Sequence, residues 1–138
     1  MKCLWIAIAL SFIALPVVAQ DKNPEPETFK MQVGDSTYVM QKYFIVFLKS
    51  GPVTDQSPEE LRELQMAHLA HLRWLAEENH ISMAGPFGDN GDIRGIVIYN
   101  TATSEQAKEL ANMDPSVKAG RLVVEVHSWW AAKGSSLQ

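Results

Sequence analysis

Hydrophobic residues recur along this chain with two periods, one typical of helices and one typical of strands. Leu61, Leu64, Leu72 and Leu75 share one face of a helix wound over residues 58–79, which predicts an amphipathic helix there. A second helix is predicted over residues 104–113, because Thr103 or Ser104 can cap its start. Continuous or alternating apolar runs predict strands over residues 42–48, 81–87, 93–99 and 121–129.

The resulting order of elements is βαββαβ. This order predicts an α+β, ferredoxin-like fold in which a four-stranded antiparallel sheet carries both helices on one face. Residues 29–41 hold Gly34-Asp35 between two short apolar runs and are predicted to add an N-terminal β-hairpin. The other face of the sheet, which includes Val123 and Trp129, has no predicted cover. Because a bare apolar face of that size associates, we expect a homodimer through the sheet face, closing a dimeric α+β barrel.

The N-terminus has the organisation of a signal peptide. Lys2 precedes an apolar run, and small residues then stand before a predicted cleavage site between Ala19 and Gln20. We therefore expect residues 1–19 to be removed and the protein to be periplasmic or secreted, without stable membrane association afterwards. An uncleaved N-terminal anchor is the alternative. Residues 20–28 contain two prolines and no large apolar side chain, so we expect a disordered leader.

Composition narrows the choice of partners and cofactors. The chain has 12 basic and 16 acidic residues, a net charge of −4, and no basic stripe, so no nucleic acid partner is expected. Its single cysteine, Cys3, lies in the predicted signal peptide, so the exported domain over residues 42–130 must rely on an ordinary core. Phosphate-loop, dinucleotide and hydrolase motifs are missing, and no cofactor is expected. Residues 131–138 are expected to form a flexible tail.

One polar residue interrupts the leucine stripe of the first predicted helix. His68 lies on the same helix face as the leucines, and two interpretations are open. It is either a structural histidine bonded to a backbone carbonyl, or a general acid or base beside a pocket. His71 could share a metal ion with it, but no third ligand follows in any local motif, so no metal site is expected. Asp114, before Pro115, either caps a turn or orients a histidine.

Two further polar positions lie on predicted strands. Arg94 shares a strand face with Ile96, so it either pairs with a carboxylate or binds an anionic group of a substrate. Glu125 and His127 alternate along the last strand, which predicts a polar pair at the surface or at the dimer seam.

Three motifs, taken in this order and spacing, resemble the YCII-related (YciI-like) family. They are His68-Leu69-Ala70-x-Leu72, Ala84-Gly85-Pro86 and Asp114-Pro115-x-Val117-x-Ala119-Gly120. The resemblance covers residues 43–130, and the closing tract KAGRLVVEVHSWW is most similar to an exported branch of the family. It implies the dimeric α+β barrel and a pocket that contains His68. Many members also have an aspartate just after the first strand, where this chain has Ser50.

The residues and the resemblance together imply a small lyase or isomerase, similar to a dehydrochlorinase, that needs no cofactor. His68 and Asp114 are the predicted catalytic residues. The predicted substrate-binding residues are Arg94, Gly85, Pro86, Ser50 and His71. The alternative is a non-catalytic periplasmic protein that binds a small ligand in the same pocket.

Overall fold

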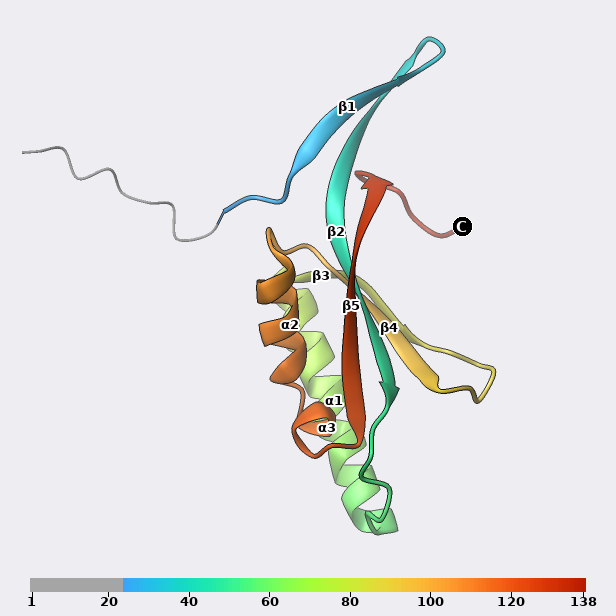
Figure 1. Cartoon of the computed structure of the whole chain (residues 1–138), viewed down its shortest axis with the longest axis vertical. Helices are drawn as coiled ribbons and strands as arrows, with labels where there is room; N and C mark the ends of the chain where they lie inside the picture. Colours follow the sequence, from blue (N-terminus) through green and yellow to red (C-terminus); the bar gives the residue numbers. More distant parts are fainter. Residues whose placement is uncertain (1–23) are drawn as a thin grey trace, which may run out of the picture.

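The computed structural model describes residues 24–138, which are drawn in colour in Figure 1. The predicted signal peptide, its cleavage site and the first residues of the predicted leader lie outside this part of the chain. Residues 24–27 have no regular secondary structure, and strand β1 (Thr28–Val33) begins directly after them.

Within the described residues, five antiparallel strands form one sheet around a long central strand, β2 (Ser36–Ser50). β2 pairs with β5 (Leu122–Ala132) on one side and with β4 (Ile93–Tyr99) on the other. β4 pairs in turn with β3 (Ile81–Pro86), so the main part of the sheet has the order β5-β2-β4-β3. This order confirms the predicted ferredoxin-like α+β fold.

The first part of β2 belongs to an N-terminal hairpin. β1 pairs with residues 36–41, and Gly34 in the turn has a φ of 57°, which suits glycine. Figure 1 shows the hairpin projecting beyond the helices. The predicted hairpin is therefore present, but the separate strand predicted over residues 42–48 is not. β2 runs from the hairpin into the sheet without a break, because no proline or glycine interrupts residues 36–50.

Two long helices cover one face of the sheet, as Figure 1 shows. α1 (Pro58–Glu77) begins with a capping box between Ser57 and Glu60, and α2 (Ser104–Asn112) begins with one between Thr103 and Gln106. Each box satisfies backbone N–H groups that have no partner within the helix. None of the helices in residues 24–138 is long and apolar enough to span a bilayer.

A third, short helix was not predicted from the sequence. Asp114 caps α3 (Pro115–Lys118), and proline at the first helical position has no N–H that needs a partner. The Asp114-Pro115 pair therefore ends α2 and also begins a new helical turn. α3 contacts both α1 and α2, so it connects the two longer helices on the helix-covered face of the sheet.

Alternation along β2 separates the two faces of the sheet. Phe44, Val46 and Leu48 are buried under the helices, in a core completed by residues such as Tyr99 and Leu75. The intervening side chains point to the opposite face, which no described element covers and which is called here the open face. Its members on the four main strands include Ile45, Phe47, Ile96, Val123 and Trp129.

Candidate active site

A cavity of about 690 Å³ lies on the helix-covered side of the molecule, between α1, β3, β4 and the start of β5. Its volume falls in the range of about 300–1,000 Å³ that is typical of sites for small molecules. Five of the predicted site residues line it: Ser50, His68, Gly85, Pro86 and Arg94. Much of the remaining wall is apolar and includes Leu48, Leu69 and Leu72.

His68 and Asp114 form a hydrogen-bonded pair at this cavity. Nδ1 of His68 lies 2.5 Å from Oδ2 of Asp114, and the two side chains are 13% and 3% exposed. The partner of His68 is thus a carboxylate and not a backbone carbonyl. Because Nδ1–H donates to Asp114, Nε2 carries the lone pair of the neutral ring. His68 lines the cavity, so Nε2 is the nitrogen that a ligand can reach.

The second oxygen of Asp114 holds the carboxylate in place. Oδ1 accepts a hydrogen bond of 2.8 Å from the backbone N–H of Ser116, in the first turn of α3. Asp114 therefore caps a helix and orients His68 at the same time, so both of its predicted roles are present. α3 is the element that sequence reasoning missed, and it sets the direction of the carboxylate.

The electrostatics of this pair favour an ionised Asp114. Burial raises the pKa of its carboxyl, but the hydrogen bond and positive charge of His68, with the Ser116 N–H, more than offset burial and lower the pKa below its ordinary value. A carboxylate that stays charged near neutral pH can stabilise a proton on His68. The arrangement therefore suits proton transfer at Nε2.

His71 lies outside the cavity, although it was predicted to bind substrate. Its Nε2 lies 3.0 Å from the backbone carbonyl of Leu110, so Nε2–H donates there and the ring contacts Trp74. Burial lowers the pKa of His71, in spite of the nearby Asp114 carboxylate, so the ring is neutral at pH 7. Three residues of helix separate the two rings by about 60° around the axis, so His71 faces α2 while His68 faces the cavity. No group of three metal-binding side chains occurs among the described residues.

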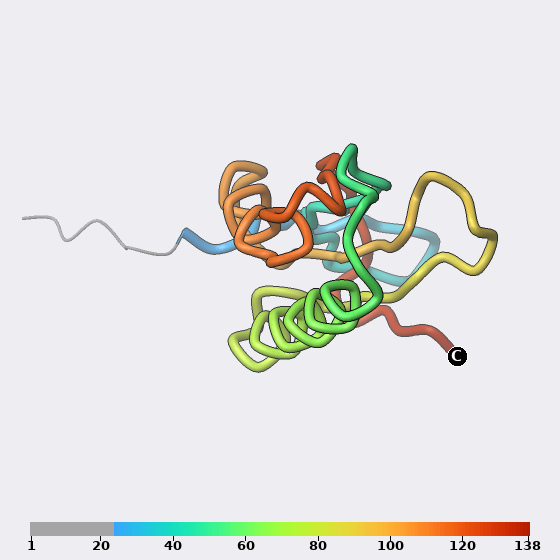
Figure 2. Tube along the Cα trace, turned by 90° about the horizontal axis from the view of Figure 1, so that it is seen from below, coloured from blue at the N-terminus to red at the C-terminus, as the bar shows by residue number. Residues whose placement is uncertain are grey.

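A close backbone contact shapes the wall near Ser50. In Figure 2 the segment after β2 runs from the α3–β5 turn to the start of α1. Gly51 N–H donates to the carbonyl of Arg121 at 2.8 Å, and a Cβ at Gly51 would lie 2.2 Å from the carbonyl oxygen of Gly120. Only glycine fits there. The contact places Ser50 and Arg121 in the same cavity wall.

Arg121 was missed by the sequence analysis, and Arg94 does not form the predicted pair with a carboxylate within the described residues. Arg94 Nη1 donates to the carbonyl of Gly91 at 3.2 Å, and no ion pair with a carboxylate of residues 24–138 is present. Arg94 is among the residues that line the cavity, and contact with a ligand there stays a prediction. The signal for Arg121 was its place directly after the family motif that ends at Gly120, at the start of a strand.

Comparison with known families identifies the domain that carries this cavity. The YCII-related domain family matches residues 43–130, which is more than half of the chain. The chain belongs to the YCII-related family. Among solved structures it is similar to 5-chloro-2-hydroxyhydroquinone dehydrochlorinase from Burkholderia phenoliruptrix, in a complex with 2,5-dihydroxybenzoquinone. The two share 25% sequence identity over 63% of this chain and 92% of that one, with a TM-score of 0.49. No curated protein matches the chain.

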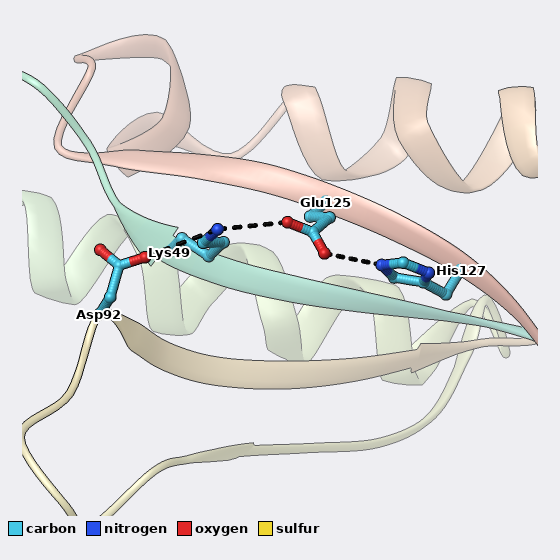
Figure 3. Close-up of polar contacts among 4 residues, drawn as sticks. All are labelled: Lys49, Asp92, Glu125 and His127. Atoms are coloured by element: carbon cyan, nitrogen blue, oxygen red, sulfur yellow. Dashed lines mark hydrogen bonds and ion pairs between the residues drawn. The ribbon is translucent and has the colours of Figure 1, made fainter.

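This YCII-related chain carries a second histidine–carboxylate pair, on the open face of the sheet (Figure 3). His127 Nε2 lies 2.7 Å from Glu125, whose other oxygen lies 3.2 Å from Lys49. Lys49 also lies 3.6 Å from Asp92. The polar pair predicted on the last strand is thus present and is joined across strands to β2. None of these four residues lines the cavity.

Proposed function

We propose that this protein is a lyase or isomerase that moves a proton on a small organic substrate and needs no cofactor. The observation that carries the proposal is the geometry of His68. Its Nδ1 is bonded to the ionised Asp114, while the ring lines a cavity of the size of a small molecule. The bond to Asp114 selects one tautomer and leaves Nε2 to take a proton.

In the proposed reaction, Nε2 of His68 accepts a proton from the substrate, and the electron pair of the broken bond stays on the substrate as an enolate-type anion. The charge of Asp114 stabilises the imidazolium that forms. Arg94 and the backbone near Gly85 lie in the same wall and would stabilise the anion. An isomerase then returns the proton to another atom, whereas a lyase expels a leaving group such as chloride. Asp114 acts through His68 and is a positioning residue.

Proton abstraction can be tested before the physiological substrate is known. Carbon acids incubated with the protein in D₂O should incorporate deuterium, which ¹H NMR measures as loss of signal. A panel of cyclic ketones, unsaturated lactones and hydroxylated quinones covers the proposed chemistry. We expect exchange with the parent protein and with His127→Gln, and none above background with His68→Gln.

The alternative function, a non-catalytic ligand-binding protein, gives a different result in the same assay. A compound that binds in the cavity but never exchanges faster with the protein than with buffer would favour binding alone. Equal exchange by the parent and His68→Gln would also overturn the proposal.

We also propose that two copies pair through the open face. Val123 and Trp129 on this face are 40% and 42% exposed, and burying such apolar surface stabilises association. In sedimentation at micromolar concentrations the parent should be a dimer, and Val123→Lys should shift it towards the monomer. Met66→Lys, at an exposed position on α1, is the matched control. A monomeric parent, or equal effects of the two variants, would contradict the pairing.

Export is the last part of the proposal and rests on the N-terminal sequence pattern alone. Intact-mass measurement of protein recovered from the periplasm or medium should show loss of residues 1–19. Full-length protein confined to the cytoplasm would refute it.

A further inference from the structure

The cavity wall, as far as residues 24–138 form it, contains basic but no acidic residues, in a protein that is acidic overall. The chain has a net charge of −4, with 16 acidic and 12 basic residues. Within the described residues, the cavity wall contains two arginines, Arg94 and Arg121, and no aspartate or glutamate. Asp114 lies behind His68 and is already bonded to it. The described wall therefore offers a ligand basic residues and no acidic side chain.

The two arginines differ in how far they are engaged. Arg94 is exposed, and its guanidinium donates to the carbonyl of Gly91. Arg121 is half-buried, and the hydrogen bonds and ion pairs found in residues 24–138 give its guanidinium no partner. A guanidinium has five N–H donors in a planar fork that fits the two oxygens of a carboxylate. Arg121 is therefore the one with its full donor set available to a ligand.

The backbone of Arg121 is held on the same frame as the histidine. Its N–H donates to the carbonyl of Ser116 at 3.0 Å, and its carbonyl accepts from Gly51 at 2.8 Å. Ser116 N–H donates to Asp114, which bonds His68. This continuous series of hydrogen bonds fixes the origin of the Arg121 side chain relative to the proton-transfer group.

We propose that the substrate is a small organic carboxylate and that Arg121 binds its carboxylate group. The apolar wall, which includes Leu69 and Leu72, would contact the hydrocarbon part. The inference rests on the proposed function for the reaction at His68, but the binding of a carboxylate does not require turnover. Arg121 is thus a specificity-determining residue of the same site.

Binding of two probes of equal shape tests this assignment. Benzoate and benzamide differ in charge but hardly in size, and titration of each into the full chain can be followed by NMR or calorimetry. We expect benzoate to bind more tightly by about tenfold, the contribution of a charge-assisted contact. Arg121→Gln should remove this preference, whereas Arg121→Lys should retain part of it because the charge is kept.

Arg73→Gln is the matched control, because Arg73 is an exposed arginine on α1 that does not line the cavity. Equal binding of benzoate and benzamide by the parent would overturn the inference. So would an unchanged preference in Arg121→Gln, or an equal loss in Arg73→Gln. Circular dichroism of each variant checks that the fold is kept, and the lysine variant gives a second reading if the glutamine variant unfolds.

The two proposals fail in distinguishable ways. If benzoate binds through Arg121 but no carbon acid exchanges deuterium, the proton-transfer function fails and the carboxylate assignment stands. If exchange depends on His68 but Arg121→Gln alters neither binding nor exchange of a keto acid, the assignment fails and the function stands.

Discussion

Two histidine–carboxylate pairs occur in this molecule, one on each side of the sheet, and they are similar in distance but not in surroundings. His68 and Asp114 are 2.5 Å apart, and His127 and Glu125 are 2.7 Å apart. The first pair is 13% and 3% exposed, whereas the second is 55% and 48% exposed. Contact distance alone therefore does not separate a candidate site from a surface pair.

The two pairs differ in how deeply they are buried and in how firmly their carboxylates are held. Asp114 has both oxygens bonded and is held by the cap of α3, so the ring of His68 has one orientation. Glu125 contacts both His127 and Lys49 at the solvent-exposed surface, where water and ions screen each contact. The first pair also faces a cavity, and the second faces the open surface of the sheet. We therefore assign proton transfer to the first pair only.

The largest expected difference is in rate. Asp114→Asn keeps the size of the side chain but removes the charge that selects the tautomer and stabilises the imidazolium. Deuterium exchange or turnover should fall by about 10²- to 10⁴-fold. Glu125→Gln makes the same chemical change in the exposed pair and should leave the rate unchanged. A loss of similar size in both variants would remove the distinction between the pairs.

The next expected difference is in stability. Asp114→Ala removes the partner of a half-buried histidine and the cap of α3, and should lower the free energy of unfolding by about 3 kcal/mol. Urea denaturation measures the change. Asp92→Ala removes an exposed carboxylate that contacts only Lys49 in this network, and should leave the denaturation midpoint where it is. A loss below about 1 kcal/mol for Asp114→Ala would mean that the buried pair is only as stabilising as a surface one.

Much of the fold could be predicted from local pattern. The spacing of the leucines in α1 and the apolar run of β4 each reflect one element that buries one face, so periodicity indicates them directly. The sequence analysis divided β2 wrongly into a hairpin strand and a separate core strand. The two parts have the same alternation, and only the pairing of residues 36–41 with β1 shows which part belongs to the hairpin. α3 was missed because four residues are too few for a period.

The site was predictable only in part, since it depends on contacts between distant residues. His68 and Asp114 are 46 positions apart, and only the packing of α1 on α3 joins them. The helix pattern placed His68 on the face of the leucines, but it did not show that His71, three residues later, contacts α2 and lies outside the cavity. Arg121 follows a family motif in the sequence, but only the fold, which brings its backbone against Gly51, places it at the cavity.

A smaller effect is expected from the histidine that faces α2. Burial lowers the pKa of His71 below its ordinary value of 6.5, so the unfolded chain binds a proton at a higher pH than the folded one. The free energy of unfolding should therefore fall as the pH drops below about 6.5. His71→Gln can still donate to Leu110 and should lose this part of the pH dependence. Identical profiles for the parent and the variant would contradict it.

The smallest effect is expected from the exposed pair itself. A double-mutant cycle of Glu125→Gln and His127→Gln isolates the contact between the two side chains. We expect a coupling within the error of urea denaturation at high salt, because both groups are hydrated in the folded chain as they are in the unfolded one. The measurement belongs at sub-micromolar protein, where pairing through the open face would not contribute. If the coupling then rises with protein concentration, the increase reports a second copy covering the pair. A coupling that stays large in the monomer would show that exposure to solvent does not weaken this contact. Only the cavity beside His68 would then distinguish the buried pair from the exposed one.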